Sequence, residues 1–262
     1  MLRPGALGDT LLAVPALRAL RGRFGSLRLA AHGGAARLLA SVGEVAQGLA
    51  FDDPSLGWLF ATTGPPCAEA IVAWMNADGV PGLQHALLVS ASRPAGNEHC
   101  AQLLLDSLAP LGVDPHLDER PLSISPVRSD DVLVHPGSGS AAKNWPAQRF
   151  AETIGALDAP VQLIVGEADA AAALEVEACL GRSLPRLTHL PLEELAARLA
   201  GCRAYLGNDS GVSHLAGLCG ARTVVLFGPT APEVWRPLGP RVQVESFDAD
   251  PTQIAEALLQ YA

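Results

Sequence analysis

Short apolar runs alternate with helical patterns along most of the chain. The apolar runs predict β-strands at residues 27–32, 49–52, 70–74, 86–90, 132–135, 161–165, 204–206, 223–227 and 242–245. Apolar residues at helical spacing predict helices at 10–24, 97–111, 147–157, 168–180, 192–200, 212–218 and 251–261. Strands that are apolar throughout and alternate with helices are typical of a parallel sheet covered on both faces.

Prolines divide this pattern into two halves. They cluster from Pro110 through Pro115, Pro121 and Pro126 to Pro136, between two periodic segments, and such clusters mark linkers. The 262 residues are enough for two small domains. We therefore predict an α/β protein with doubly wound units at 1–125 and 126–262 and a ligand crevice between them.

The charge balance excludes some partners. The formal net charge is −9, which argues against a nucleic-acid protein held by phosphate contacts and against a strongly basic membrane-docking surface. A local basic patch remains possible, because every basic residue except Lys143 is an arginine.

Cysteine and histidine spacing gives no sign of a disulfide framework or a metal site. The five cysteines are scattered without a Cys-x-x-Cys pair, and the seven histidines lack metal-ligand spacing. The first residues do not resemble a signal peptide, and no apolar run approaches the ~20 residues that span a bilayer. These features predict a cytoplasmic protein with reduced thiols and no metal or other cofactor.

One polar segment follows a predicted strand and opens a helix. Residues 207–217 (GNDSGVSHLAG) place Asp209, Ser210 and Gly211 where the strand 204–206 turns into the helix 212–218. Ligands of open α/β sheets bind beside the carboxyl ends of strands, and helix N-termini attract anions. The segment therefore predicts a site for a phosphorylated ligand. The alternative is that Asp209 or Ser210 only caps the helix, with His214 as a packed helical histidine.

A second loop follows the strand 132–135. Residues 136–146 (PGSGSAAKNWP) combine a glycine-serine turn, including Ser138 and Gly139, with Lys143. Backbone N–H groups of such a turn bind anions, and Lys143 adds a point charge. The loop matches neither a Walker A nor a dinucleotide fingerprint. It is equally compatible with an ordinary turn and a solvated lysine.

A Ser-His-Asp hydrolase built from Ser138, His135 and Asp209 is a weak alternative for these two segments. The sequence contains no Gly-x-Ser-x-Gly elbow to present the serine as a nucleophile.

A third turn lies at the N-terminus. Residues 3–9 (RPGALGD) deliver Asp9 to the start of a helix, where a carboxylate could take a proton from an acceptor hydroxyl. A plain helix cap is the alternative.

Taken together, these segments resemble the ADP-heptose:lipopolysaccharide heptosyltransferases of glycosyltransferase family 9. The resemblance rests on residues 3–9, 135–138, 143–146, 208–216 and 227–230, with 166–169 after a strand, and it covers nearly the whole chain. It implies a GT-B architecture, in which two Rossmann-like domains face each other across a cleft. The acceptor binds the first domain and the nucleotide sugar binds the second. It also implies an inverting reaction without a metal, at the inner face of a membrane that the enzyme touches transiently.

The resemblance also assigns roles to residues. Asp9 becomes the general base, and Glu167 and Asp169 lie where the family has an acidic contact to the nucleotide ribose. The implied donor-binding group comprises Ser138, Gly139, Lys143, Glu167, Asp209, Ser210, Gly211 and His214, with His214 supporting the loop. The terminal helix 251–262 would cross back onto the first domain. Only Met1 and Leu2 precede the first motif, so the first domain is expected to be shortened and its first strand largely missing.

The expected function is transfer of a sugar, a heptose, from an ADP-sugar to a lipopolysaccharide core or another cell-surface glycan. The alternative is a non-catalytic nucleotide-sugar-binding relic without a working acceptor site. A sugar-nucleotide epimerase of the GT-B type is a weaker possibility.

Overall fold

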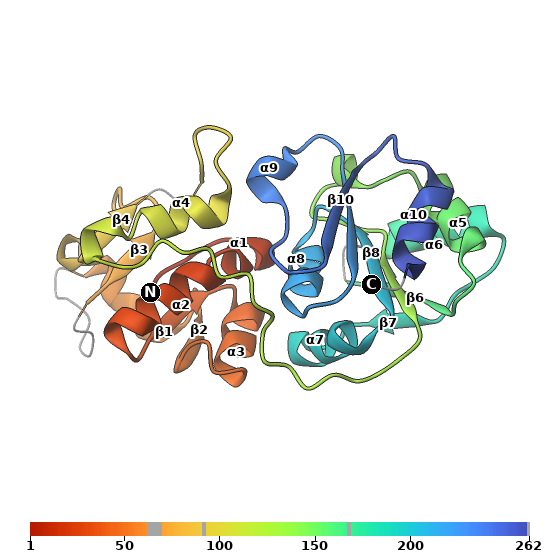
Figure 1. The fold of residues 1–262 in the computed structure, drawn as a ribbon. Helices are drawn as coiled ribbons and strands as arrows, with labels where there is room; N and C mark the ends of the chain where they lie inside the picture. Colours follow the sequence, from red (N-terminus) through yellow and green to blue (C-terminus); the bar gives the residue numbers. More distant parts are fainter. Residues whose placement is uncertain (62–69, 91–92, 167–168, 261–262) are drawn as a thin grey trace. The chain divides into compact units, whose positions relative to one another are not determined.

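The computed structural model describes residues 1–61, 70–90, 93–166 and 169–260. The chain divides into two compact units, Met1–Asp118 and Glu119–Ala262 (Figure 1). The division lies inside the proline-rich segment, slightly before the predicted position. Each unit contains parallel strands and helices, as the alternating pattern predicts.

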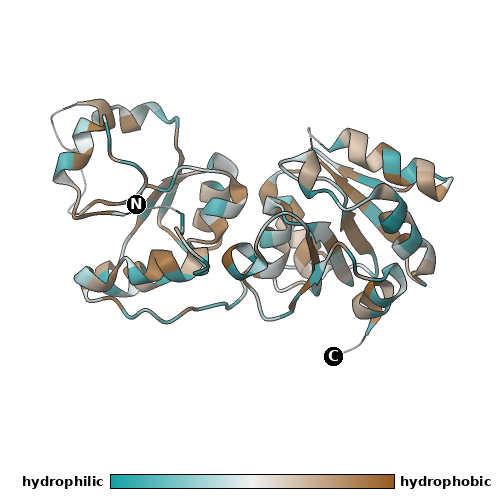
Figure 2. Cartoon of the chain, turned by 90° about the horizontal axis from the view of Figure 1, so that it is seen from above, coloured by the Kyte–Doolittle hydropathy of each residue, from teal (hydrophilic) through white to brown (hydrophobic). Residues whose placement is uncertain are grey.

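The second unit is built on a six-stranded parallel sheet in the order β10-β9-β8-β5-β6-β7. This is the Rossmann strand order, in which the chain returns to the middle of the sheet and then builds outward on the other side. Within the described residues the strands are β5 (Val132–His135), β6 (Val161–Val165), β7 (Arg186–Thr188), β8 (Ala204–Asn208), β9 (Thr223–Phe227) and β10 (Val242–Ser246). The adjacent strands β5, β8 and β9 are buried along their whole length, which explains why most of their residues are apolar (Figure 2).

Helices separate the strands of this sheet. They are α5 (Ala147–Ala156), α6 (Ala170–Leu180), α7 (Leu192–Gly201), α8 (Gly211–Leu218), α9 (Pro232–Trp235) and α10 (Pro251–Leu259), with a 3-10 turn, η4, at Ala141–Lys143. Helix α5 packs against α6 and α10, whereas α8 packs against α7. The core between α5, α6, α10 and the sheet includes Phe150, Val176 and Leu206.

The terminal helix α10 lies on the second unit itself. Its buried residues Ile254 and Leu258 belong to that unit's core, and the helix contacts α5, β8 and β9. This differs from the predicted return onto the first half. The reason is that the apolar face of α10 is covered by its own sheet.

The described part of the first unit contains two pairs of parallel strands, β1 (Arg28–Ala31) with β2 (Gln47–Ala50) and β3 (Val72–Trp74) with β4 (Leu88–Ser90). Leu2 joins them, since it forms parallel bridges to both Ala30 and Ala73. Its N–H donates to the carbonyl of Val72 at 2.9 Å, and Trp74 donates back to Leu2 at 3.0 Å. The first three residues therefore lie between the two pairs of strands, in the central position. The first strand, which was expected to be largely missing, is present as this short segment.

Helices of the first unit differ from the prediction in detail. They are α1 (Leu7–Leu11), α2 (Val14–Phe24), α3 (Gly33–Ser41) and α4 (Cys100–Asp106), with 3-10 turns η1 (Pro54–Phe60), η2 (Pro81–His85) and η3 (Ala109–Leu111). The predicted single helix at 10–24 is wrong, because Pro15 has no N–H to continue a helix from α1. Helix α3 has no counterpart in the prediction, since Gly33 and Gly34 suggest a turn.

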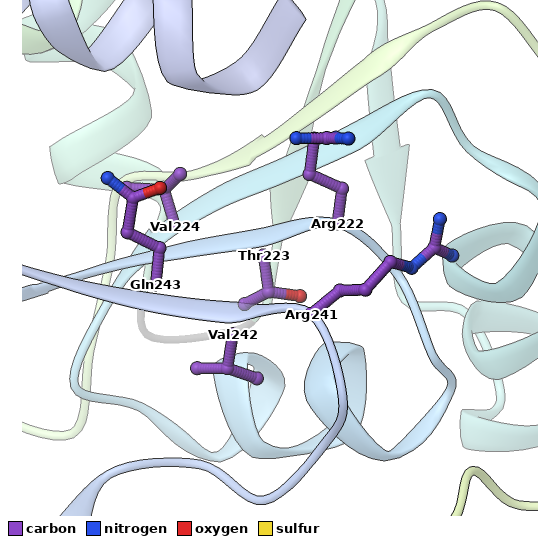
Figure 3. Close-up of a pocket in the computed structure, with 6 residues that line it drawn as sticks. All are labelled: Arg222, Thr223, Val224, Arg241, Val242 and Gln243. Carbon is purple, nitrogen blue, oxygen red and sulfur yellow. The ribbon is translucent and has the colours of Figure 1, made fainter. Parts of the chain in front are cut away.

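A surface hollow of about 240 Å³ lies at the amino ends of β9 and β10 in the second unit (Figure 3). Thr223 and Val242, the first residues of these strands, line it together with Arg222 and Arg241. The hollow is thus at the opposite end of the strands from the predicted ligand loops. Within the described part of the chain, no helix is long and apolar enough to cross a membrane.

Candidate functional site

The predicted donor loops gather at the carboxyl ends of neighbouring strands. Strands β5 and β8 pair directly, with His135 opposite Gly207, so the loops that begin at Pro136 and Asp209 leave the sheet side by side. The helices that follow these strands, α5 and α8, pack with different partners. This is the strand-order reversal at which open α/β sheets bind ligands.

Lys143 reaches across from the β5 loop to the β8 loop. Its Nζ lies 3.1 Å from Oδ2 of Asp209 and 3.2 Å from the carbonyl of the same residue. The lysine side chain is 27% exposed and the aspartate side chain 9%. Thr230, beyond β9, donates its hydroxyl to the same Oδ2 at 2.8 Å. Lys143 is therefore a partly accessible cation, oriented by Asp209, beside the N-terminus of α8.

Ser138 and Gly139 have different positions within the β5 loop. The Ser138 hydroxyl lies 2.6 Å from the Ser140 carbonyl and 2.7 Å from Oδ1 of Asn144, so it shapes its own loop. A side chain added at Gly139 would meet no neighbouring atom within 4 Å. The backbone at Gly139 is consequently open to a ligand, which the predicted role requires.

A buried amide that the sequence interpretation passed over fixes this loop. Asn208, with no exposed surface, donates to the carbonyl of Pro136 at 2.8 Å and accepts the N–H of Trp145 at 2.8 Å. It thereby holds both ends of the loop that carries Lys143. A polar residue at the end of a buried strand was the available signal, because a buried amide needs partners.

Ser210 is the N-cap of α8. Its Oγ accepts the N–H of Ser213 at 3.4 Å, and Gly211 is the first residue of the helix. The capping alternative is therefore correct for Ser210, and it is compatible with an anion site, since the first N–H groups of a helix remain unpaired within it. His214 is buried on α8, as expected for a packed helical histidine.

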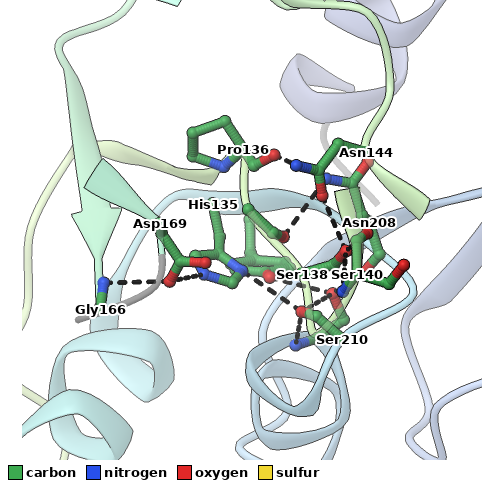
Figure 4. A network of polar contacts seen from close by, with 12 residues as sticks. His135, Pro136, Ser138, Ser140, Asn144, Gly166, Asp169, Asn208 and Ser210 are labelled. Atoms are coloured by element: carbon green, nitrogen blue, oxygen red, sulfur yellow. Dashed lines mark hydrogen bonds and ion pairs between the residues drawn. The ribbon is translucent and has the colours of Figure 1, made fainter. Parts of the chain in front are cut away.

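His135, at the end of β5, connects Ser210 with Asp169. Its Nε2 lies 2.9 Å from Oδ2 of Asp169, and its Nδ1 lies 3.3 Å from Oγ of Ser210 (Figure 4). The hydrogen bond from His135 holds the pKa of Asp169 below its usual value. Gly166 donates its N–H to the same oxygen at 3.0 Å.

Two sequence assignments can be compared with this geometry. Asp169 directs its carboxylate toward His135 inside the unit, and its expected ribose contact stays a prediction. Glu167 lies outside the described residues. The Ser-His-Asp hydrolase considered from the sequence is not formed, because His135 contacts Ser210 and Asp169 rather than Ser138 and Asp209.

Asp9 lies at the start of the first unit, in the short helix α1. Its Oδ1 is 3.3 Å from the guanidinium of Arg3, which is only 1% exposed, and its Oδ2 accepts the N–H of Ala6 at 2.9 Å. Burial lowers the pKa of Arg3, and the charge of Asp9 opposes this shift. Gly5, at φ +135°, is required here because a Cβ would lie 2.7 Å from Oδ2 of Asp9.

The described residues contain no cluster of three or more His, Cys, Asp or Glu side chains placed to hold a metal ion. In the described residues of the donor loops, Lys143 forms an ion pair with Asp209, and His135 contacts Asp169.

Comparison with known proteins gives the following relatives. The family model of glycosyltransferase family 9 (heptosyltransferase) matches residues 106–257. Lipopolysaccharide heptosyltransferase 2 of Escherichia coli (strain K12) is 33% identical over 113 residues, which cover 39% of this chain and 32% of that protein. The matched stretch thus spans about a third of the length of this curated relative.

Solved structures resemble the whole chain at low identity. The glycosyl transferase family 9 protein of Veillonella parvula DSM 2008 has a TM-score of 0.80 at 17% identity, over 98% of this chain and 95% of that one. E. coli heptosyltransferase WaaC with ADP has a TM-score of 0.76 at 17% identity, over 97% of both chains. These likenesses confirm the predicted fold class, an α/β protein of the GT-B type with two Rossmann-like units.

Proposed function

The chain belongs to glycosyltransferase family 9, the heptosyltransferase family, and on that premise we propose that it is an inverting, metal-independent glycosyltransferase. Its donor is an ADP-activated sugar, a heptose. Its acceptor is a hydroxyl of a lipopolysaccharide core or of another cell-surface glycan. The acceptor oxygen bonds to the anomeric carbon as the bond from that carbon to the diphosphate breaks, and ADP leaves.

The observation that carries this proposal is the position of Lys143. Its ammonium lies beside the N-terminus of α8, at the strand-order reversal, which is where open α/β sheets generally bind ligands. A departing diphosphate needs positive charge, and a fixed ammonium with helix N–H groups supplies it by electrostatic stabilisation. Asp209 orients the ammonium until the donor arrives. Gly139 and Gly211 let the diphosphate approach the backbone.

Asp9 is the proposed general base. An ionised carboxylate can accept the proton that the acceptor hydroxyl loses on attack. Arg3 and the N–H of Ala6 hold the carboxylate in one orientation, which a base in a directed proton transfer requires. Because the acceptor is a cell-surface glycan precursor, we place the enzyme in the cytoplasm with transient contact to the inner membrane.

Nucleotide titration tests the donor assignment. We expect calorimetry of the purified protein to give tightest binding for ADP among ADP, UDP, GDP and dTDP, with the same affinity after treatment with EDTA. Preference for another base would remove the heptose assignment, and loss of binding with EDTA would remove metal independence. ADP binding without turnover of ADP-heptose on any acceptor would favour the binding-only alternative.

A further inference from the structure

We propose that His135 and Asp169 are positioning residues, which hold the donor loops in their binding geometry by acting on Ser210. The identity of the ligand in this inference rests on the proposed function. His135 is the last residue of β5, and Asp169 and Ser210 follow β6 and β8. One buried chain of hydrogen bonds therefore connects the segments that leave these three strands.

The direction of each hydrogen bond follows from the chemistry of Asp169. Its pKa is held below the usual value, so its carboxylate is ionised and only accepts hydrogen bonds. Nε2 of His135 must then carry a proton and donate it to Asp169. This donation fixes the ring, and Nδ1 faces Oγ of Ser210 at 3.3 Å.

Ser210 transmits this fixed orientation to α8. Its hydroxyl can donate to Nδ1 of His135 while its oxygen accepts the N–H of Ser213, which caps the helix. Oγ of Ser213 in turn lies 2.9 Å from the buried hydroxyl oxygen of Tyr205, and the Ser213 hydroxyl donates to the carbonyl of Asn208 at 2.5 Å. The N-terminus of α8 is thus fixed by buried hydrogen bonds from the interior of the unit.

Close packing adds a second link between Asp169 and the β5 loop. A Cβ at Gly137 would lie 2.0 Å from Oδ1 of Asp169, so the loop backbone rests directly on this carboxylate. Movement of Asp169 would therefore shift the backbone immediately before Ser138 and Gly139 as well as the cap of α8.

A nucleophilic role does not explain the same contacts. Ser210 is 7% exposed, and its oxygen is engaged by the helix that it caps. Attack on a substrate would require release of this cap. The arrangement therefore supports the loops rather than reacting.

Two substitutions at Asp169 and one control distinguish an effect on the geometry of the donor loops from a general loss of folding stability. Asp169→Ala removes both carboxylate oxygens. Asp169→Asn keeps one oxygen, which can still accept the hydrogen bonds from His135 and Gly166. The matched control is Glu177→Ala. Glu177 is also buried and accepts the N–H of Leu184 at 3.0 Å and a hydrogen bond from Arg186, but it lies before β7, away from the donor loops.

We expect Asp169→Ala to weaken ADP binding by about tenfold, measured by calorimetry well below the unfolding temperature of each variant. Asp169→Asn should stay within about threefold of the wild type. Glu177→Ala should lower the unfolding temperature without changing ADP affinity. Equal ADP affinity for Asp169→Ala and wild type, or equal losses in Asp169→Ala and Glu177→Ala, would overturn the proposal.

Hydrogen–deuterium exchange of the free protein tests the same inference without a nucleotide. Asp169→Ala should accelerate exchange of the amides at residues 137–140 and 211–214, and Glu177→Ala should not. Acceleration confined to residues 166–170 would refute the coupling. If the wild type fails to bind ADP, the proposed donor is wrong, and the exchange result still decides whether the three loops are connected.

Discussion

The Asp9 turn and the donor loops are held in opposite ways. Asp9 takes its partners from its own segment, with Arg3 six residues away and Ala6 three residues away. The donor loops take theirs from distant segments: His135 and Ser210 are 75 residues apart, and Lys143 and Asp209 are 66 residues apart. A local turn depends on few groups, whereas the donor loops depend on the correct strand order.

The two regions also differ in the number of contacts that hold them in place. Among the residues that the structure describes, Asp9 forms one ion pair, with the buried Arg3. The donor loops share the Asn208 bridge, the Lys143–Asp209 pair and the His135–Asp169 pair. We therefore expect a single substitution at the Asp9 turn to abolish sugar transfer, and a single substitution in the donor loops to weaken ADP binding only in part.

Asp9→Asn should have the largest effect. Loss of a general base slows a reaction by about 10²- to 10⁴-fold, and we expect this loss in the initial rate of transfer from ADP-heptose. ADP affinity should stay within about twofold, because the change leaves every donor loop intact. Asp53→Asn, which alters an exposed capping carboxylate of the same unit, is the control. Unchanged turnover in Asp9→Asn would remove the assigned role.

Arg3→Met should mainly affect stability. Removal of one partner of a buried ion pair costs about 3 kcal/mol, and here it also removes the group that orients Asp9. Scanning calorimetry should show a lower unfolding temperature for the transition of the first unit and an unchanged transition for the second. A shift of both transitions by the same amount would contradict the local character of the Asp9 turn.

Lys143→Ala should weaken ADP binding by about 10- to 100-fold, since hydrogen bonds to charged groups contribute about 1.5–3 kcal/mol. Lys143→Arg keeps the charge and should recover part of the affinity, which titration calorimetry can compare directly. Equal ADP affinity for the wild type and Lys143→Ala would show that the donor phosphates bind elsewhere.

The smallest expected effect is that of acid on the free energy of unfolding, and we expect it in the second unit. The hydrogen bond from His135 lowers the pKa of Asp169 in the folded protein, so its stabilisation is complete above the unfolded pKa. That stabilisation is lost as the pH falls below about 4, through the folded pKa. Chemical denaturation of the wild type should therefore show a steeper loss of unfolding free energy from pH 4 to pH 2 than Asp169→Asn. Parallel pH profiles would refute the contribution of this pair.

Much of the site could be predicted where the determinants are short in range. The apolar runs indicated the buried strands, and residues next to their carboxyl ends supplied Lys143, Asp209 and Ser210. The cap at Ser210 depends on its own helix, and the Asp9 turn depends on Gly5 and Arg3 nearby. Pro15 shows the limit of this approach, since the helical pattern at 10–24 continues across the break between α1 and α2.

The partners of these residues could not be predicted, because they depend on which strands are neighbours. The contact of Asp169 with His135 depends on the pairing of β5 and β6 in the sheet. Asn208, at the end of β8, and Thr230, in the loop after β9, contact the candidate site for the same reason.

The sequence by itself determined the α/β class, the apolar strands and the polar residues that follow them, because periodicity and turn chemistry act over a few residues. Only the tertiary structure decided that three residues at the N-terminus bridge two pairs of strands, and that His135 joins Asp169 to Ser210. Both results require segments far apart in the chain to pack on one sheet, and the burial of helix faces, rather than any local pattern, selects that order.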